Sequence, residues 1–353
     1  MHIKSFIIEV IMSEKPAVLN TETIVQDILN SIDREREREI IARRYGLFDR
    51  KETLEQIGEL LGITRERVRQ LEKSVMTKLR QTSTELPHVK EVEAAVLAVL
   101  GEAGDTARVT ALASKLTAEN TRTDQSRLAF LTELCPNISV VSEDDTYFQA
   151  AGNTKTHDTL TIKKEVAGLV DAIKKTGKPV AAKDLTKLTG MDSETYAVAL
   201  ASISKQLATL NGRWGLVKWP TVNPKNIRDK IYVILSENKK HMHFNEIAQA
   251  IKASDFKRKD VTTQAIHNEL IKDKRFVLIG RGIYALKEWG YEKGTVADII
   301  SEVLREAKQP LHRDEIVQRV LKSRFVKETT ILLNLQSKPQ FKRVAKATYE
   351  LSE

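Results

Sequence analysis

The sequence predicts a mainly α-helical protein, in which an N-terminal helix-turn-helix precedes about four tandem winged-helix modules with short β-hairpin wings. Three observations lead to this fold class. Residues 54–80 contain two helical patterns separated by a glycine, and residues 226–288 share a pattern with residues 291–353. The composition, with 30% charged residues, 15 Gly and 8 Pro in 353 residues, is typical of a helix-rich soluble protein of small units.

The N-terminal helix-turn-helix is predicted from the two faces of its second helix. Val68, Leu71, Val75 and Leu79 recur at steps of three and four residues, which places them on one buried stripe. The charged residues between them fall on the other faces. The second helix therefore has one apolar face for packing and a cationic face for another role.

The turn between the two helices has suitable residues. Gly62 can adopt a positive φ where the chain reverses, and Thr64 can cap the second helix with its hydroxyl. Gly58 lies inside the first helix, where glycine costs about 1 kcal/mol relative to alanine. We therefore expect Gly58 to lie where the two helices touch closely.

The first turns of the second helix carry side chains that can distinguish bases. Arg65 and Glu66 lie in the first turn, the end that enters a major groove, and Arg69 and Gln70 follow one turn later. Arginine can bind guanine through two hydrogen bonds, glutamine can bind adenine, and glutamate can accept from cytosine. The alternative is a surface helix of a small bundle whose charges are only solvated.

The segment DREREREIIARRYGLFDRKETLEQIGELLGITRERVRQLEKSVMTKLR closely resembles region 4 of sigma-70 family transcription initiation factors, over about residues 32–80. The resemblance implies recognition of a −35 promoter element and docking on the flap of RNA polymerase. It also implies two sets of DNA contacts. The base contacts are Arg65, Glu66 and Gln70, and the backbone contacts are Arg36, Arg44, Thr53, Leu54, Arg69 and Lys73.

The resemblance does not extend to the domain with which full sigma factors melt the −10 element. About thirty residues precede the match here, and Phe6 is their one aromatic residue. We therefore expect that this chain does not open a promoter alone. Residues 1–20 are predicted to be disordered or an extension, and Met12 is an alternative start to Met1.

The compartment is predicted from cysteine usage and hydropathy. Cys135 is the one cysteine, which excludes an internal disulfide framework and a multi-cysteine zinc site. The apolar run 6–12 is too short to span a bilayer. A cytoplasmic, nucleoid-associated protein without cofactors or membrane contact is expected.

Charge is distributed unevenly along the chain, whose net charge is +9. Residues 1–87 carry 15 basic and 15 acidic side chains, but residues 60–81 carry six basic and two acidic ones. Residues 88–157 are acidic, with 6 basic and 10 acidic side chains, and suit a protein partner better than a phosphate backbone. The remaining segments are moderately basic, which permits nucleic-acid binding without requiring it.

A repeated plan follows Pro87. The predicted modules are a helix-turn-helix at 21–85, a degenerate winged helix at 88–152, a winged helix at 160–221 and two clearer winged helices at 225–289 and 291–353. Each winged helix is expected to contain three helices followed by two short strands. The expected hairpins include 276–279 with 283–286, across Gly280-Arg281-Gly282, and 138–141 with 146–149, around residues 143–145. Four aromatic residues on these strands are predicted to be core residues: Trp214, Phe276, Tyr284 and Tyr349.

The last two modules, and more faintly residues 163–220, resemble the HARE-type helix-turn-helix, a winged-helix module of the bacterial RNA polymerase delta subunit and of chromatin and restriction proteins. The resemblance rests on PLHRDEIVQRV and GRGIYALKEWGY. It implies a fold more than an activity, because the family includes DNA readers and protein-contact modules.

Two basic features of residues 225–289 could contact DNA. Arg281 lies at a glycine-flanked wing tip and could reach a phosphate or a minor groove, and Lys257, Arg258 and Lys259 form a second cationic loop. The alternative for both is a solvated loop.

No catalytic pattern is present. Residues 176–179, TGKP, lack the upstream glycine and the hydroxyl of a phosphate-binding loop. His243 recurs in the repeat as His312, which favours a structural role such as a helix cap over metal binding. Cys135 is expected at the buried end of a helix, and Asp144-Asp145 in a hairpin turn.

Two hypotheses of different classes follow. The first is a DNA-binding transcription regulator that reads a short promoter-like sequence in double-stranded DNA with the helix 64–80. The second is an RNA polymerase accessory or decoy protein, which binds the polymerase flap through the sigma-like module and the enzyme through the winged helices. A third, the DNA-targeting arm of a nuclease or modification system, would need a catalytic partner chain.

Overall fold

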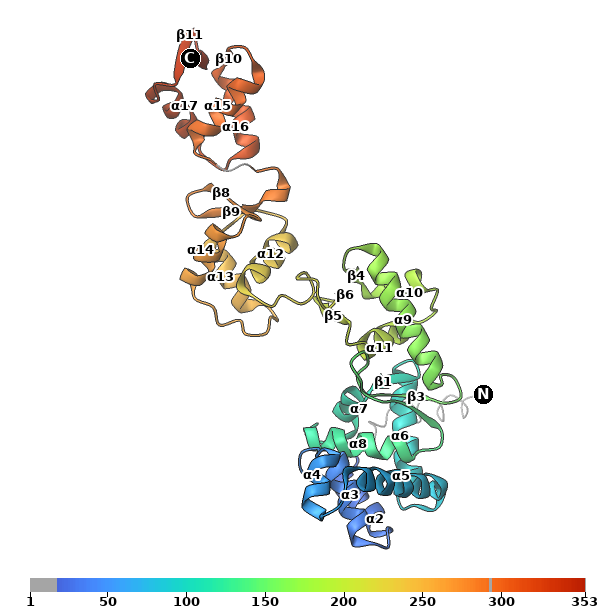
Figure 1. Cartoon of the computed structure of the whole chain (residues 1–353). Coiled ribbons are helices and arrows are strands. Elements are labelled where there is room, and N and C mark those ends of the chain that lie inside the picture. Colours follow the sequence, from blue (N-terminus) through green and yellow to red (C-terminus); the bar gives the residue numbers. More distant parts are fainter. Residues whose placement is uncertain (1–17, 292–293, 353) are drawn as a thin grey trace, which may run out of the picture. The chain divides into compact units, whose positions relative to one another are not determined.

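The computed structural model describes residues 18–291 and 294–352, so the predicted extension lies largely outside the described residues. The chain divides into two compact units, Met1–Val217 and Lys218–Glu353, which are described separately (Figure 1). The described residues are mainly helical with small antiparallel sheets, which confirms the predicted class at this level. No helix among the described residues is long and apolar enough to cross a membrane.

From residue 18, where the described residues begin, the first unit has four helices before the first block. They are α2 (Thr21–Asn30), α3 (Glu35–Tyr45), α4 (Leu54–Leu61) and α5 (Arg65–Gln81), followed by the 3-10 turn η1 (Ser83–Glu85). Helices α4 and α5 form the predicted helix-turn-helix. Val68, Val75 and Leu79 of α5 are buried as predicted, and Leu71 is partly buried.

Within residues 18–291 and 294–352, four blocks repeat one order of elements: helix, strand, helix, helix, strand, strand. The first block contains α6 (Val89–Glu102), β1 (Thr106–Arg108), α7 (Val109–Leu116), α8 (Arg122–Leu134), β2 (Ile138–Val141) and β3 (Ala150–Asn153). The second block contains α9 (Thr159–Thr176), β4 (Val180–Ala181), α10 (Ala182–Thr189), α11 (Glu194–Ile203), β5 (Leu207–Leu210) and β6 (Arg213–Leu216). Both belong to the first unit.

The second unit contains the other two blocks. The third block contains α12 (Ile227–Asn238), β7 (Met242–His243), α13 (Phe244–Ala253), α14 (Thr263–Lys272), β8 (Phe276–Gly280) and β9 (Ile283–Leu286), followed by η2 (Lys287–Trp289). The fourth block contains α15 (Val296–Ala307), β10 (Leu311–His312), α16 (Arg313–Ser323), α17 (Glu328–Ser337), β11 (Phe341–Ala345) and β12 (Thr348–Leu351).

Each block has a strand that the sequence analysis did not predict. It lies between the first two helices and pairs with the last strand, so that all four sheets have the spatial order first, third, second, as in β7-β9-β8. These extra strands are two or three residues long, too short for the alternation by which a strand is recognised. Met242 shows their role, because it is buried and pairs with Tyr284.

The predicted hairpin of the first block is wrong in its second strand. Strand β2 pairs with Ala150–Asn153, not with residues 146–149. The carboxylate of Asp144 accepts hydrogen bonds from the backbone N–H groups of Thr146 and Tyr147 and forms the predicted turn, but the chain then leaves the sheet. Tyr147 instead forms an antiparallel bridge with Ser204 of the second block.

The hairpin of the third block is as predicted. Strands β8 and β9 join across Gly280, Arg281 and Gly282, and Gly282 adopts a φ of 71°. The aromatic residues of the hairpin strands are core residues as predicted, since the following are all buried: Trp214, Phe276, Tyr284 and Tyr349.

Helices α2, α3 and α5 share one continuous hydrophobic core with the first block, which includes Ile28 of α2, Met76 of α5, Val96 of α6 and Phe130 of α8. Ile57 of α4 instead packs with Ile40 and Val68 in a separate small cluster. Helix α8 contacts α2, α3 and α5 (Figure 1). The helix-turn-helix is therefore covered on one side by the block that follows it.

In the second unit, the loop after α16 contacts the β8–β9 hairpin of the third block. The N–H of Phe325 donates to the carbonyl of Ile279 (3.1 Å), and the guanidinium of Arg324 donates to the carbonyl of Leu278. These bonds occupy part of the outer edge of β8, close to the tip that carries Arg281.

Candidate nucleic-acid interface

The turn between α4 and α5 fixes the angle of the second helix. Gly62 ends α4 with a φ of 66°, and the hydroxyl of Thr64 accepts from the N–H of Arg67 (3.2 Å) as the N-cap of α5. A Cβ on Gly58 would lie 2.7 Å from the carbonyl oxygen of Ile63. The predicted close approach at Gly58 is confirmed, and the contact is made by the turn itself.

A groove of about 470 Å³ lies between the N-terminal ends of α4 and α5, and we call it the α4–α5 groove. Glu55 lines this groove together with six of the predicted DNA contacts: Arg44, Thr53, Leu54, Arg65, Glu66 and Arg69. The hydroxyl of Thr53 caps α4 by accepting from the N–H of Gln56. In return, the side-chain oxygen of Gln56 accepts from the N–H of Thr53. The N-terminal ends of two capped helices therefore face this groove, and both favour anions.

A second groove, the outer α5 groove of about 580 Å³, follows the exposed side of α5. It contains the remaining predicted contacts of this helix, Gln70 and Lys73, and shares Arg69 with the α4–α5 groove. Arg36 lines neither groove. Its guanidinium donates to the carbonyl of Leu61 (2.5 Å) and so satisfies the C-terminal end of α4.

The side chains of the first two turns of α5 form a network. Arg69 donates two hydrogen bonds to Glu66, at 2.7 and 3.0 Å, and Gln70 donates to the same carboxylate at 3.5 Å. The bonds from Arg69 hold the pKa of Glu66 below its usual value. Arg65 is exposed and has no hydrogen-bond or ion-pair partner among the described residues. The network fixes Glu66 and leaves Arg65 available to a ligand.

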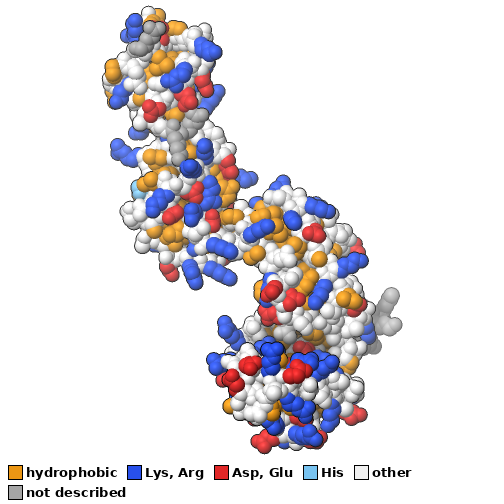
Figure 2. All heavy atoms as spheres, viewed as in Figure 1, with side chains coloured by type: hydrophobic (Ala, Val, Ile, Leu, Met, Phe, Trp, Pro, Cys, Tyr) orange, Lys and Arg blue, Asp and Glu red, His pale blue; other side chains and the backbone are white. Residues whose placement is uncertain are grey.

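Arg44 lies at the rim of the α4–α5 groove. Its Nε pairs with Glu72 of α5 (3.3 Å), and its Nη1 donates to the carbonyl of Glu52 (3.3 Å). The guanidinium therefore links α3, α5 and the loop before α4. Lys and Arg side chains are interspersed with Asp and Glu over the N-terminal helices (Figure 2).

The basic features predicted in the third block are exposed but separate from these grooves, in the second unit. Arg281 lies at the wing tip, and the side chains of Lys257, Arg258 and Lys259 are exposed. The backbone of the loop is fixed from within, because the ammonium of buried Lys230 donates to the carbonyls of Lys257 (2.8 Å) and Arg258 (2.7 Å).

The histidines of the repeat cap helices, as the structural alternative predicted. The ring Nδ1 of His243 accepts from the N–H of Asn245 (3.3 Å), and that of His312 accepts from the N–H of Asp314 (3.4 Å). Cys135 lies at the buried C-cap of α8, as predicted, and burial raises the pKa of its thiol to about 12. In the described ranges, no three His, Cys, Asp or Glu side chains are arranged to hold a metal.

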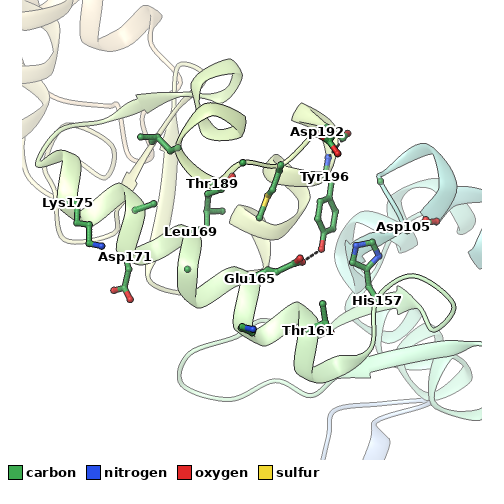
Figure 3. A pocket seen from close by; sticks show the side chains of 18 of the residues that line it. Asp105, His157, Thr161, Glu165, Leu169, Asp171, Lys175, Thr189, Asp192 and Tyr196 are labelled. Atoms are coloured by element: carbon green, nitrogen blue, oxygen red, sulfur yellow. Dashed lines mark hydrogen bonds between the residues drawn. The ribbon is translucent and has the colours of Figure 1, made fainter.

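The sequence analysis missed an open cavity of about 1250 Å³ in the first unit, formed by α9, the loop before α11 and the turn around Asp105 (Figure 3). The hydroxyl of Tyr196 donates to the carboxylate of Glu165, and the ring of His157 lies 4.5 Å from that of Tyr196. Burial, together with Glu165, raises the pKa of Tyr196. No periodicity indicated this cavity, because its residues come from distant parts of the sequence.

The geometry of α4 and α5 defines a class of protein region, the DNA-binding helix-turn-helix. Comparison with known proteins gives the particular family: residues 34–81 match the family Sigma-70, region 4. RNA polymerase sigma factor SigA from Bacillus sp. is 43% identical over 60 residues. That match covers 17% of this chain and 16% of SigA, so the chain spans about one sixth of this relative's length. Residues 34–81 are thus similar to sigma-70 region 4, which supports a sigma-factor-like DNA-binding region here.

Proposed function

We propose that this protein is a DNA-binding transcription regulator that reads a short, −35-type promoter sequence with α5. The four blocks are proposed to be winged-helix modules, the last two of the HARE type, that extend the contact along DNA or hold RNA polymerase. A cytoplasmic, nucleoid-associated location accompanies this proposal. The sigma-70 region 4 match of residues 34–81 supports the assignment of α5 to DNA.

The observation that carries the proposal is the α4–α5 groove. It gathers the side chains that the sigma-like pattern assigns to DNA on the side of the helix-turn-helix that α8 leaves uncovered. The C-terminal half of α5 packs in the core shared with the first block. The N-terminal ends of both helices, with their arginines, therefore stay exposed in this groove.

Each side chain has a distinct proposed role. Arg65 binds a guanine through two hydrogen bonds, Glu66 accepts from a cytosine amine, and Gln70 binds an adenine edge. Thr53, with the backbone of Leu54, donates to a phosphate at the start of α4, and Arg44 and Arg69 bind flanking phosphates. Each specific base contact is worth about 1–3 kcal/mol of discrimination.

Binding-site selection from random duplex DNA tests the proposal. The wild-type chain is expected to enrich one short motif, and Arg65→Ala to lose preference at one base pair of it while retaining the rest. Arg34→Ala is the matched control, because Arg34 lies at the start of α3 and lines neither groove. No enriched motif, or a motif unchanged by Arg65→Ala, would falsify the proposed reading.

The second candidate function is that of an RNA polymerase accessory protein, in which the sigma-like region binds the polymerase flap. The excess of acidic residues in 88–157, 10 against 6 basic, favours it. Salt titration separates the two candidates. Binding through six or more phosphates gives a log-log slope of about −5 or steeper, whereas an accessory protein binds DNA weakly at every salt concentration. Pull-down of polymerase subunits completes the comparison.

A further inference from the structure

A third groove lies where the loop before α4 meets the first block. It has a volume of about 710 Å³, and four cationic side chains line it: Arg50, Lys51, Arg108 and Arg122. We call it the basic groove. Arg50 and Lys51 come from the loop that precedes α4, Arg108 from the end of β1 and Arg122 from the first residue of α8. The groove therefore exists only because the helix-turn-helix and the first block pack together.

The packing that creates the basic groove is specific. Arg127 of α8 is buried, and its Nε donates to the carbonyl of Leu47 (2.7 Å) in the loop before α4. Its guanidinium also pairs with Glu22 of α2 (2.7 Å). These bonds hold the loop that carries Arg50 and Lys51 beside the N-terminal end of α8.

The charge balance of the basic groove is cationic, although the first block as a whole is acidic. Asp49 and Glu143 are the acidic side chains that line it. Glu143 pairs with Lys205 of the second block (2.8 Å) and also lies near enough to Arg108 to stabilise its charge, so two acidic side chains face four cations. The acidic composition of residues 88–157 therefore does not describe the surface that the first block presents here.

Arg108 is the most buried of the four cations in the basic groove. Its guanidinium lies 3.6 Å above the ring of Phe148, and its Nε is buried without a hydrogen-bond partner among the described residues. Burial lowers the pKa of Arg108, because the charged form loses hydration. An anion in the groove would add to the counter-charge that Glu143 provides to Arg108.

The basic groove adjoins the α4–α5 groove. Lys51 lines the first and Thr53 lines the second, and two residues span at most about 7 Å of chain. We propose that the basic groove binds phosphates of the DNA strand that runs on from the α4–α5 groove, so that the first block lengthens the DNA contact of the sigma-like region. This inference rests on the proposed function, because the strand is placed by the recognition of its neighbouring site.

The test compares the salt dependence of DNA binding by the full-length chain and two triple variants. R50Q/K51Q/R122Q removes three cations of the basic groove and leaves Arg108 stacked on Phe148. The matched control K155Q/K174Q/K178Q removes the same charge from exposed lysines that line neither the basic groove nor the α4–α5 groove. Equal melting temperatures establish that the variants are folded.

Three lost phosphate contacts should flatten the log-log salt slope by about 2–3, since each contact contributes about 0.9. The selected base preference should not change, because base contacts come from α5. The control should keep the wild-type slope. A groove variant whose slope equals that of the control overturns the proposal.

Duplex length tests the position of the groove. Extending the selected site by about one helical turn on the side bound by α4 should raise the affinity of the wild type, and this gain should vanish in R50Q/K51Q/R122Q. No gain in the wild type overturns the placement of the strand. If the wild type selects no motif, the proposed function fails, and a flattened slope on random duplexes would still support a phosphate contact in the basic groove. The two failures are therefore distinguishable.

Discussion

Two helical glycines, Gly58 and Gly101, differ in the space available to an added Cβ. In α4, a Cβ on Gly58 would lie 2.7 Å from the backbone oxygen of Ile63, which cannot move without moving the turn. In α6, a Cβ on Gly101 would meet no atom within 4 Å. The same substitution should therefore have opposite effects on stability at the two positions.

Gly58→Ala is expected to destabilise the first unit by about 1–3 kcal/mol, because overpacking at the turn exceeds the gain in helix propensity. Gly101→Ala is expected to stabilise it by about 0.5–1 kcal/mol. Calorimetric melting of the full-length chain measures both. Stabilisation by Gly58→Ala would contradict the close contact.

The capping box of α8 makes part of the stability of the first unit depend on pH. Burial would raise the pKa of Asp124, but hydrogen bonds from Thr121 and Thr21 outweigh it and lower the pKa. A carboxyl whose pKa is lower in the folded state stabilises above its unfolded pKa, about 3.9, and loses this contribution as the pH falls through the folded value.

Asp124→Asn should therefore lower the melting temperature at pH 7, and the difference from wild type should shrink below about pH 4. Asp145→Asn, at an exposed position of the turn after β2, is the control and should have little effect at either pH. A difference for Asp124→Asn that stays constant from pH 7 to pH 3 would count against this role.

At the scale of elements, α8 has two structural roles that its sequence does not reveal. It is a helix of the first block, and its buried residues also cover α2, α3 and α5. Its polar side chains reach the same elements: Glu133 accepts from the hydroxyl of Tyr45 (3.0 Å) and pairs with Arg80 of α5 (2.7 Å). The orientation of α5 is thus fixed from both its turn and its C-terminal half.

Arg127→Met tests this coupling. The substitution leaves the carbonyl of Leu47 and the carboxylate of Glu22 without their guanidinium partner. We expect it to lower the free energy of unfolding by roughly 2–3 kcal/mol. Lys115→Met removes an exposed pair with Glu102 and should cost at most about 1 kcal/mol. Urea unfolding followed by circular dichroism compares the two variants, and equal costs would show that the Arg127 bonds do not hold the junction.

At the scale of the whole molecule, the shared core decides which parts of the chain can fold separately. Val25 of α2 and Met76 and Leu79 of α5 lie in the same cluster as Val92 and Phe130 of the first block. The fourth block, in contrast, has a core formed from its own residues. Independence of folding therefore differs between parts that looked equally modular in the sequence.

A fragment of residues 1–86 should consequently fold poorly, because the apolar faces of α2 and α5 lose their cover, whereas residues 1–217 should fold and retain the DNA preference of the full chain. Amide NMR spectra measure whether each fragment folds, and binding to the selected duplex measures its DNA preference. A well-dispersed spectrum from residues 1–86 would show that the first block is not needed.

Local pattern and chemistry were enough to predict the helix-turn-helix, its Thr64 cap, the wing of the third block and the capping histidines, since each depends on residues close together in the sequence. The contacts of α5 with DNA stay predictions, but their assembly in the α4–α5 groove follows from the helical spacing of Arg65, Glu66 and Arg69.

Only the tertiary structure determined the features that join distant residues. The two- and three-residue strands carry too little pattern to be predicted. Tyr147 forms a bridge with Ser204 of the second block, a pairing that depends on the path of the chain after Asp144. The basic groove combines a loop before α4 with the ends of β1 and α8. Composition gives the net charge of a segment, whereas packing decides which charged side chains lie together. An acidic block can therefore contribute to a cationic groove.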